Sequence, residues 1–199
     1  MTRIPQQKRS IDTRERVLKA AEELFAQEGF YTTNTKRIAA RAGVAIGSLY
    51  SYYGDKKVLF LAVLEEYNRT ISERIALVRP DAANLVDRQG GLEKLIKEIF
   101  RAHADSPGFY RQATLLRETD PDVRNMMEAQ EKEQRTVAVK YLSAWGNRLR
   151  TKDLEAAAFV IFGAIESIAH SLAQAETAIA SKRLIRELSD MILRYLFPK

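Results

Sequence analysis

Hydroxyl-bearing side chains are concentrated in one short segment, residues 41–56, which reads RAGVAIGSLYSYYGDK. Two glycines stand four positions apart in this segment, and three tyrosines fall within four positions. Serine and tyrosine hydroxyls can donate hydrogen bonds to phosphate oxygens or to base edges, so nucleic-acid contact is the chemistry that this segment could perform. The plain structural alternative is a tight corner between two helices of an all-helical protein.

The spacing around this segment predicts a helix-turn-helix, with short helices at about 35–42 and 45–53. Two helices that cross closely need a small residue at the crossing, here Ala39, and a residue that tolerates positive φ in the turn, here Gly43. Apolar side chains at Ile38, Val44 and Leu49 would hold the second helix on the first. Five suitable positions in register make a tight corner without function a weak explanation.

Helical periodicity continues through the rest of the chain, and we predict nine helices and no strand. The first helix is expected to begin at a cap on Asp12 and to end at Gly29. A long fourth helix is expected from a cap at Asp55 to Pro80, followed by a loop over Asp81–Gly91. The segments DSPG, TDPD and WGNRLRTKD divide the remainder into further helices, including a short sixth helix of about three turns.

Composition narrows the class of protein. The 199 residues include 46% hydrophobic and 29% charged residues, and the longest uncharged apolar run is shorter than the roughly 20 residues that span a bilayer. The basic start of the chain lacks the apolar core of a secretory signal, so we expect a cytoplasmic protein that does not enter a membrane. Residues 1–60 carry 11 Lys and Arg against 6 Asp and Glu, which places most of the net charge of +6 in the first third. This asymmetry is typical of a module that faces nucleic acid joined to a near-neutral module. A basic surface that only keeps the protein soluble would show the same charge distribution.

Residues for catalysis or metal binding are sparse. Glu166 and His170 share a helix face at i, i+4, but no HExxH motif and no third ligand at a recognisable spacing accompany them. A hydrogen-bonded pair in a pocket or interface is the better interpretation. There are no cysteines, no glycine-rich phosphate loop and no serine nucleophile elbow, so we expect no enzyme activity, no cofactor and no metal.

Residues 12–64, DTRERVLKAAEELFAQEGFYTTNTKRIAARAGVAIGSLYSYYGDKKVLFLAVL, resemble the DNA-binding domain of the TetR family of transcriptional regulators. The resemblance covers the helix ending in ELFAQEGF, the segment TTNTKRIAARAGV, the recognition helix GSLYSYY and the opening DKKVLFLAV of a long fourth helix. It implies an all-α fold with a three-helix helix-turn-helix domain at residues 1–66. The long fourth helix would join this domain to a C-terminal helical bundle, residues 67–199, for ligand binding and dimerisation.

The resemblance also implies the DNA contacts. The start of the second helix, Tyr50, Tyr52, Lys56 and the leading edge of the recognition helix fall at positions that usually meet phosphates or bases, which gives the set Thr33, Asn34, Ala45, Ile46, Gly47, Ser48, Tyr50, Tyr52 and Lys56. The sequence departs from the family pattern at Ala45 and Ile46, where polar or cationic side chains are common. Ile46 could pack on thymine methyl groups or could face the core.

The second segment carries no comparable motif. Resemblance to the family implies that its last two helices pair with their copies in a homodimer through Gly163, Ala164, Leu184, Leu188 and Ile192; the alternative is a single buried central helix. We expect a largely apolar effector pocket in the bundle. Its candidate residues are His103, Phe109, Leu116, Arg117, Trp145, Phe159, Phe162, Glu166 and His170.

Together these features predict a ligand-responsive repressor that binds double-stranded palindromic operator DNA as a homodimer and is released by a small molecule. A constitutive DNA-binding protein without an effector is the alternative, followed by a small-molecule-binding protein that has lost its operator. A change of DNA affinity on adding a compound separates the first two, and sequence-specific DNA binding excludes the third.

Overall fold

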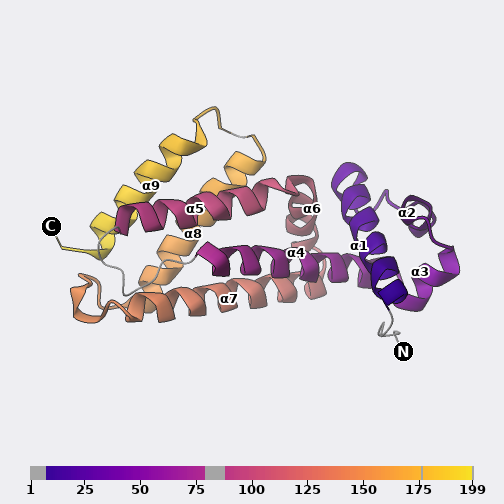
Figure 1. The fold of residues 1–199 in the computed structure, drawn as a ribbon, viewed down its shortest axis with the longest axis horizontal. Coiled ribbons are helices and arrows are strands. Elements are labelled where there is room, and N and C mark those ends of the chain that lie inside the picture. The colour runs from indigo at the N-terminus through magenta and orange to yellow at the C-terminus, as the bar shows by residue number, and fades with distance from the viewer. Residues whose placement is uncertain (1–7, 79–87, 176, 199) are drawn as a thin grey trace. The chain divides into compact units, whose positions relative to one another are not determined.

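The computed structural model describes residues 8–78, 88–175 and 177–198, and within these residues the chain is helical, with no strand (Figure 1). This confirms the predicted all-α fold. The helices are α1 (Lys8–Glu28), α2 (Thr35–Ala42), α3 (Ile46–Tyr52), α4 (Lys56–Val78), α5 (Arg88–Ala104), α6 (Pro107–Arg117), α7 (Pro121–Ser143), a short 3-10 helix η1 (Gly146–Arg148), α8 (Leu154–Ala173) and α9 (Ser181–Leu196).

The helix boundaries follow local sequence signals, with two corrections. Helix α1 begins at Lys8, so Asp12 lies inside the helix and does not cap it; the helix ends before Gly29, whose φ of 84° only glycine adopts freely. Asp55 caps α4 as predicted, because its carboxylate accepts a hydrogen bond from the Val58 N–H. Helix α5 begins at Arg88, which corrects the end of the predicted loop; most of that loop and the predicted stop at Pro80 lie outside the described residues.

The described chain forms two compact units. The first unit combines residues up to Arg69 with Ser106–Met127, and the second combines Thr70–Asp105 with the residues from Glu128 onward. Helix α6 therefore belongs to the same compact unit as the helix-turn-helix, although it is separated from it in the sequence. The division into a DNA-binding domain at 1–66 and a ligand-binding domain at 67–199 stays a prediction.

In the first unit, helix α1 lies between α2 and α6 and contacts both (Figure 1). The apolar side of α1 supplies Val17 and Phe25, which are fully buried. Phe25 and Phe109 both pack against Phe60, with ring centroids 5.1 and 5.0 Å away. Helix α6 approaches α1 closely at Gly108, where an added Cβ would lie 2.8 Å from the carbonyl oxygen of Ala26.

In the second unit, helices α5, α8 and α9 contact one another and enclose an apolar core. Small residues on α8, such as Ala157 and Ala169, are fully buried and allow close helix contact. Trp145, before η1, packs edge-to-face on Phe197 at 5.1 Å, and the Arg88 guanidinium lies 4.3 Å from the centre of the Phe197 ring. Together these contacts close the core near the C-terminal end of α9.

Candidate functional site

The turn between α2 and α3 has the geometry that the sequence predicted. Gly43 has a φ of 65°, and its N–H donates to the Ala40 carbonyl, which ends α2. Ile38 and Leu49 are fully buried, and Ala39 is buried between the helices. These contacts hold α3 on α2, so the helix-turn-helix prediction is confirmed.

The leading edge of α3 is open to solvent. Ala45, Ile46, Gly47 and Ser48 are all exposed, whereas Leu49 anchors the helix from its inner face. Ile46 is 37% exposed and therefore does not face the core, whereas its contact with thymine methyl groups stays a prediction. An extra Cβ on Gly47 would meet no atom of the described residues within 4 Å, so the backbone there can approach another surface closely.

The two tyrosines of the predicted DNA-binding set differ in exposure. Tyr50 is 48% exposed, and its hydroxyl shares a hydrogen bond of 2.8 Å with the hydroxyl of Thr35 at the start of α2. Tyr52 is half-buried at the end of α3. The Thr35–Tyr50 contact fixes the ring of Tyr50 relative to α2 and leaves its outer edge in solvent.

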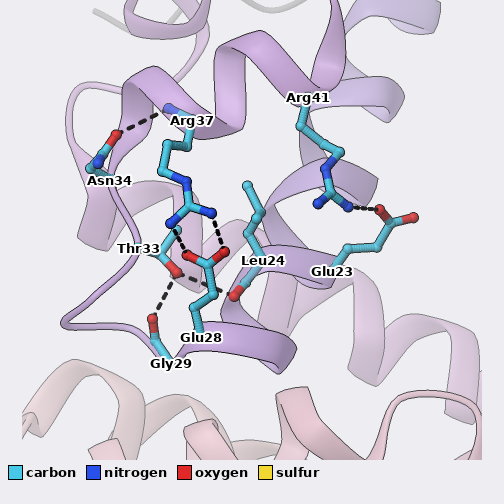
Figure 2. A network of polar contacts seen from close by, with 8 residues as sticks. All are labelled: Glu23, Leu24, Glu28, Gly29, Thr33, Asn34, Arg37 and Arg41. Carbon is cyan, nitrogen blue, oxygen red and sulfur yellow. Dashed lines mark hydrogen bonds and ion pairs between the residues drawn. The ribbon is translucent and has the colours of Figure 1, made fainter.

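Figure 2 shows the polar network at the start of α2, where two neighbouring predicted residues play different parts. Asn34 is exposed and caps α2, because its side-chain oxygen accepts from the Arg37 N–H at 3.0 Å. Thr33 is only 1% exposed, and its hydroxyl is within hydrogen-bond distance of the carbonyls of Gly29 (2.7 Å) and Leu24 (3.2 Å). The structure therefore ties Thr33 to the end of α1 and corrects the expectation that its hydroxyl faces a phosphate.

The same network contains two arginines that the sequence reasoning did not select. Arg37 forms an ion pair with Glu28, and Arg41 forms one with Glu23 at 3.0 Å (Figure 2). Both guanidinium groups remain about half exposed, so they could exchange these partners for phosphates. Their position on the exposed side of α2, three and seven residues after Asn34, was the signal available in the sequence.

Lys56 also has a different surrounding from the one expected. Its ammonium group donates to the carbonyls of Phe30 (2.7 Å) and Thr33 (2.9 Å), contacts that of Tyr31 (3.4 Å), and lies 4.5 Å from the centre of the Phe30 ring. Burial lowers the pKa of this lysine. Because an ammonium group has three N–H donors, this arrangement uses its donors to hold the loop before α2. The geometry thus gives Lys56 a positioning role in place of the predicted DNA contact.

An apolar cavity of about 300 Å³ lies inside the second unit. Three of the predicted effector residues line it, namely Trp145, Phe162 and Glu166. Sequence reasoning missed most of the wall, whose side chains come from α4, α5, α7, α8 and α9; they include Leu92, Ile99, Tyr141, Ile161 and Leu196. Their helical periodicity marked them as apolar positions, but no local signal separates a cavity wall from an ordinary core.

Four predicted effector residues lie elsewhere, which corrects the expected pocket. Phe109, Leu116 and Arg117 belong to α6 in the first unit, where Phe109 is fully buried against Phe60. Phe159 lies on α8 but is 63% exposed and does not line the cavity. The sequence predicted that these four residues line one pocket, whereas in the fold they lie in different units or on an exposed helix face.

A polar cluster of His103, Glu166 and His170, of which His103 is buried and the other two are half-buried, adjoins the cavity through Glu166. His103 Nε2 lies 3.1 Å and His170 Nε2 lies 3.3 Å from the same carboxylate oxygen, Glu166 Oε2. The centroids of the two imidazole rings are 5.0 Å apart. Burial works to raise the pKa of Glu166, but hydrogen bonds and charge from the two histidines outweigh it and lower this pKa to about 2. Burial works to lower the pKa of His103, yet the contact with Glu166 leaves it raised.

The predicted dimer residues divide into two groups. Gly163 is exposed, and Ala164 and Leu184 are half-buried. Leu188 and Ile192 are buried in the core of their own chain, and Ile192 also lines the cavity, which corrects their assignment to a surface. The exposed apolar side chains nearby are Phe159 and Val160 on α8 and Met191 on α9, with exposed fractions of 63%, 56% and 50%.

Comparison with curated proteins finds relatives among bacterial regulators. The chain is 40% identical over 68 residues to the HTH-type transcriptional regulator HbdR of Aromatoleum sp., which covers 32% of this chain and 30% of that protein. It is 32% identical over 97 residues to the HTH-type transcriptional repressor NicS of Pseudomonas putida, which covers 49% and 44%. The matched part is therefore less than half the length of each of these two relatives.

Solved structures share the fold over nearly the whole chain. A TetR-like transcriptional regulator from Rhodococcus sp. has a TM-score of 0.69 at 20% identity, covering 96% of this chain and 99% of that one. The fatty acid degradation regulator FadR from Bacillus halodurans has a TM-score of 0.71 at 17% identity, covering 91% and 94%. At these identities the similarity concerns the fold alone.

Two family models divide the chain between them. The model described as bacterial regulatory proteins, tetR family, matches residues 17–63, and the tetracyclin repressor-like C-terminal domain matches residues 90–196. The first match contains the turn at Gly43 and the exposed edge of α3, and the second contains Trp145, Phe162 and Glu166 of the cavity. With both halves matched in this order, the chain belongs to the TetR family of regulatory proteins.

Proposed function

We propose that this protein is a sequence-specific, DNA-binding transcriptional repressor that acts as a cytoplasmic homodimer and leaves its operator when a small molecule binds. The observation that carries the proposal is the exposed leading edge of α3, residues 45–48, on a helix whose inner face is fixed by Leu49. Such a helix can enter a major groove with its first residues facing base edges. The proposal includes no enzymatic step.

The DNA contacts that we propose follow from exposure. Asn34 and Tyr50 would meet the phosphate backbone together with Lys36 and the two arginines of α2, because all of these side chains are exposed. Ile46 and Ser48 would face the bases, Ile46 by apolar contact with thymine methyl groups. This arrangement gives phosphate contacts to α2 and base readout to α3.

Replacing Ile46 tests the base readout. An Ile46→Lys variant should select a different set of sequences from a randomised DNA pool, because a cation at this position favours guanine over a thymine methyl group. The matched control is Leu115→Lys, which adds the same charge at an exposed apolar position on α6 of the same unit. Unchanged sequence preference in Ile46→Lys, or equal wild-type affinity for selected and random DNA, would contradict the proposal.

The effector is proposed from the cavity. Its wall is mostly apolar, and Glu166 supplies a carboxylate, which suits a largely apolar compound with one or two polar groups. Binding of operator and effector should then be reciprocal: each lowers the affinity of the protein for the other by the same factor. Titrating a compound found by library screening, with and without operator, measures both constants; equal compound affinity in the two titrations would favour the constitutive alternative.

The homodimer is proposed from α8. By length and composition this helix could cross a membrane, yet only 22% of its apolar stretch is buried within the chain. Its inner face nevertheless packs on α5 and α9 and carries Glu166 and His170, which belong to a protein interior. We therefore assign the outer face, with Phe159, Val160 and Gly163, to a second copy of the chain and not to lipid.

A further inference from the structure

We propose that His103, Glu166 and His170 bind a divalent first-row transition-metal ion such as Zn²⁺. The sequence supplied only the Glu166–His170 pair on α8, and the expectation of no metal rested on the lack of a third ligand. The fold brings His103 to this pair from α5, 63 residues away from Glu166. One ligand atom from each of the three residues then lies within 4.8 Å of the other two.

The spacing of the donor atoms fits a metal of this kind. Zinc binds imidazole nitrogen and carboxylate oxygen at about 2.0–2.1 Å in tetrahedral geometry, which places neighbouring ligand atoms about 3.3–3.4 Å apart. The two separations from Glu166 Oε2, to His103 Nε2 and to His170 Nε2, are 3.1 and 3.3 Å. The ligand nitrogens of the two histidines lie within 4.8 Å of one another, so binding of an ion would also require the two imidazoles to move closer together.

The orientation of His103 supports the same assignment. Its Nδ1 lies 2.9 Å from the carbonyl oxygen of Ile99, so Nδ1 carries the proton and donates. The lone pair of Nε2 is then left facing Glu166 Oε2, so a proton or a metal ion is needed between these two acceptors. A backbone carbonyl that holds the distant ring N–H is the usual support of a metal-binding histidine.

The surroundings also favour a cation. His103 is 3% exposed and Glu166 is half-buried, so the cluster lies in a partly dry region where the negative charge of the carboxylate is weakly screened. Two imidazoles and one carboxylate suit zinc, copper, nickel or iron better than magnesium or calcium, which prefer oxygen ligands. Three protein ligands leave a coordination position, and because Glu166 lines the cavity, water or a basic atom of a cavity ligand could occupy it.

The composition of the chain makes the test specific. It has no cysteine and only two histidines, both in the cluster, so an untagged protein offers no competing imidazole or thiolate. Isothermal titration of EDTA-treated, desalted protein with Zn²⁺ should show saturable uptake of one ion per chain. Imidazole nitrogen NMR signals of both histidines should shift together, and Co²⁺ should give the visible absorption of a low-coordinate site. Absence of saturable uptake, or a shift of only one histidine, would overturn the proposal.

Variants separate the cluster from adventitious binding. Glu166→Gln and His170→Gln should each weaken Zn²⁺ binding by more than about tenfold. Glu133→Gln, which removes another carboxylate of the cavity wall, should leave it unchanged. If Glu166→Gln does not fold, as judged by circular dichroism, the half-buried His170 provides the second test. Uptake that survives both cluster variants would overturn the proposal. These measurements contain no DNA, so their failure would not affect the proposed regulatory function.

Discussion

The helix-turn-helix and the histidine cluster are both polar sites, but they are assembled over very different distances along the chain. At the start of α2, the bonds of Asn34 and Thr33 join residues 3 to 9 positions apart. In the second unit, the contact of His103 with Glu166 joins residues 63 positions apart. The first site is largely exposed and set by caps and turns, whereas the second, in which His103 is buried and Glu166 and His170 are half-buried, is set by helix packing. Substitutions at the two sites should therefore have different effects on DNA binding and on stability.

The largest expected effect comes from a change in the second unit that is measured on DNA. A Val160→Glu substitution places a charge on the exposed apolar face of α8 and should prevent dimerisation while leaving the chain folded. Losing the second half-site contact should then weaken operator binding on the order of a thousandfold. Light scattering gives the mass and fluorescence anisotropy gives the affinity. Ser167→Glu, at another exposed position of α8, tests how far along the helix the face extends. A wild-type protein that is monomeric at micromolar concentration would contradict the dimer.

A change in close packing should affect folding of the first unit. In Gly108→Ala the new Cβ would lie 2.8 Å from the backbone carbonyl of Ala26, which cannot move without shifting α1. We expect the free energy of unfolding to fall by about 1–3 kcal/mol. The control is Gly47→Ala, where the new methyl group meets no atom in the described part of the chain and should raise stability by up to about 1 kcal/mol. Urea denaturation measures both, and equal stability of the two variants would show that α1 and α6 do not pack as described.

The cluster of His103, Glu166 and His170 should give the second unit a pH-dependent stability. The pKa of Glu166 is depressed from 4.5 to about 2, so its contribution is present above about pH 4.5 and is lost as the pH falls toward 2. The pKa of His103 is raised above 6.5, so its contribution is present below about pH 6.5 and is lost as the pH rises through the folded value. The cluster, which also contains His170, should therefore stabilise most between these limits.

Glu166→Gln tests this dependence. The variant should lose about 1–3 kcal/mol near pH 5.5, because a neutral amide cannot hold the imidazolium of His103. Its melting temperature should also vary less with pH than that of the wild type. Thermal melts in EDTA across this range, with Glu133→Gln as the matched carboxylate control, supply the measurement. If the melting temperatures of wild type and Glu166→Gln changed with pH in the same way, the cluster would not contribute to the stability of the fold.

The smallest expected effects distinguish two lysines of the first unit. Lys36 is exposed on α2, and Lys36→Ala should reduce the slope of log affinity against log salt by about one without a change in stability. Lys56→Ala should instead lower stability by about 1 kcal/mol, because it removes the contacts that hold the loop before α2, and should leave the salt slope unchanged. Salt titrations of operator binding, paired with thermal melts, test both; a smaller slope for Lys56→Ala would restore it as a phosphate contact.

Much of the fold was predictable because its signals are local. The turn at Gly43, the cap at Asp55 and the end of α1 at Gly29 each depend on a few neighbouring residues. The helical periodicity of apolar residues predicted the helices between these turns and caps. The start of α1 at Lys8 was missed because a favourable cap residue such as Asp12 can also lie inside a helix.

Site residues were less predictable, because the same residue type can face several environments. Lys56 and Thr33 have the polar groups expected at a DNA surface, yet these groups donate hydrogen bonds to nearby backbone carbonyls. Phe109 and Phe159 resemble pocket aromatics, yet one is buried in the first unit and the other is exposed on α8. Periodicity assigns a residue to a helix face, but it does not say what that face meets.

The sequence by itself determined the helical class, the helix-turn-helix and the resemblance to one family, because these depend on spacing over a few residues. Only the tertiary structure decided which side chains line the cavity and that His103 and His170 contact the same carboxylate oxygen of Glu166. Contacts between distant segments are set by the packing of whole helices. Local sequence patterns identify the helices, but they do not say which helix faces pack together.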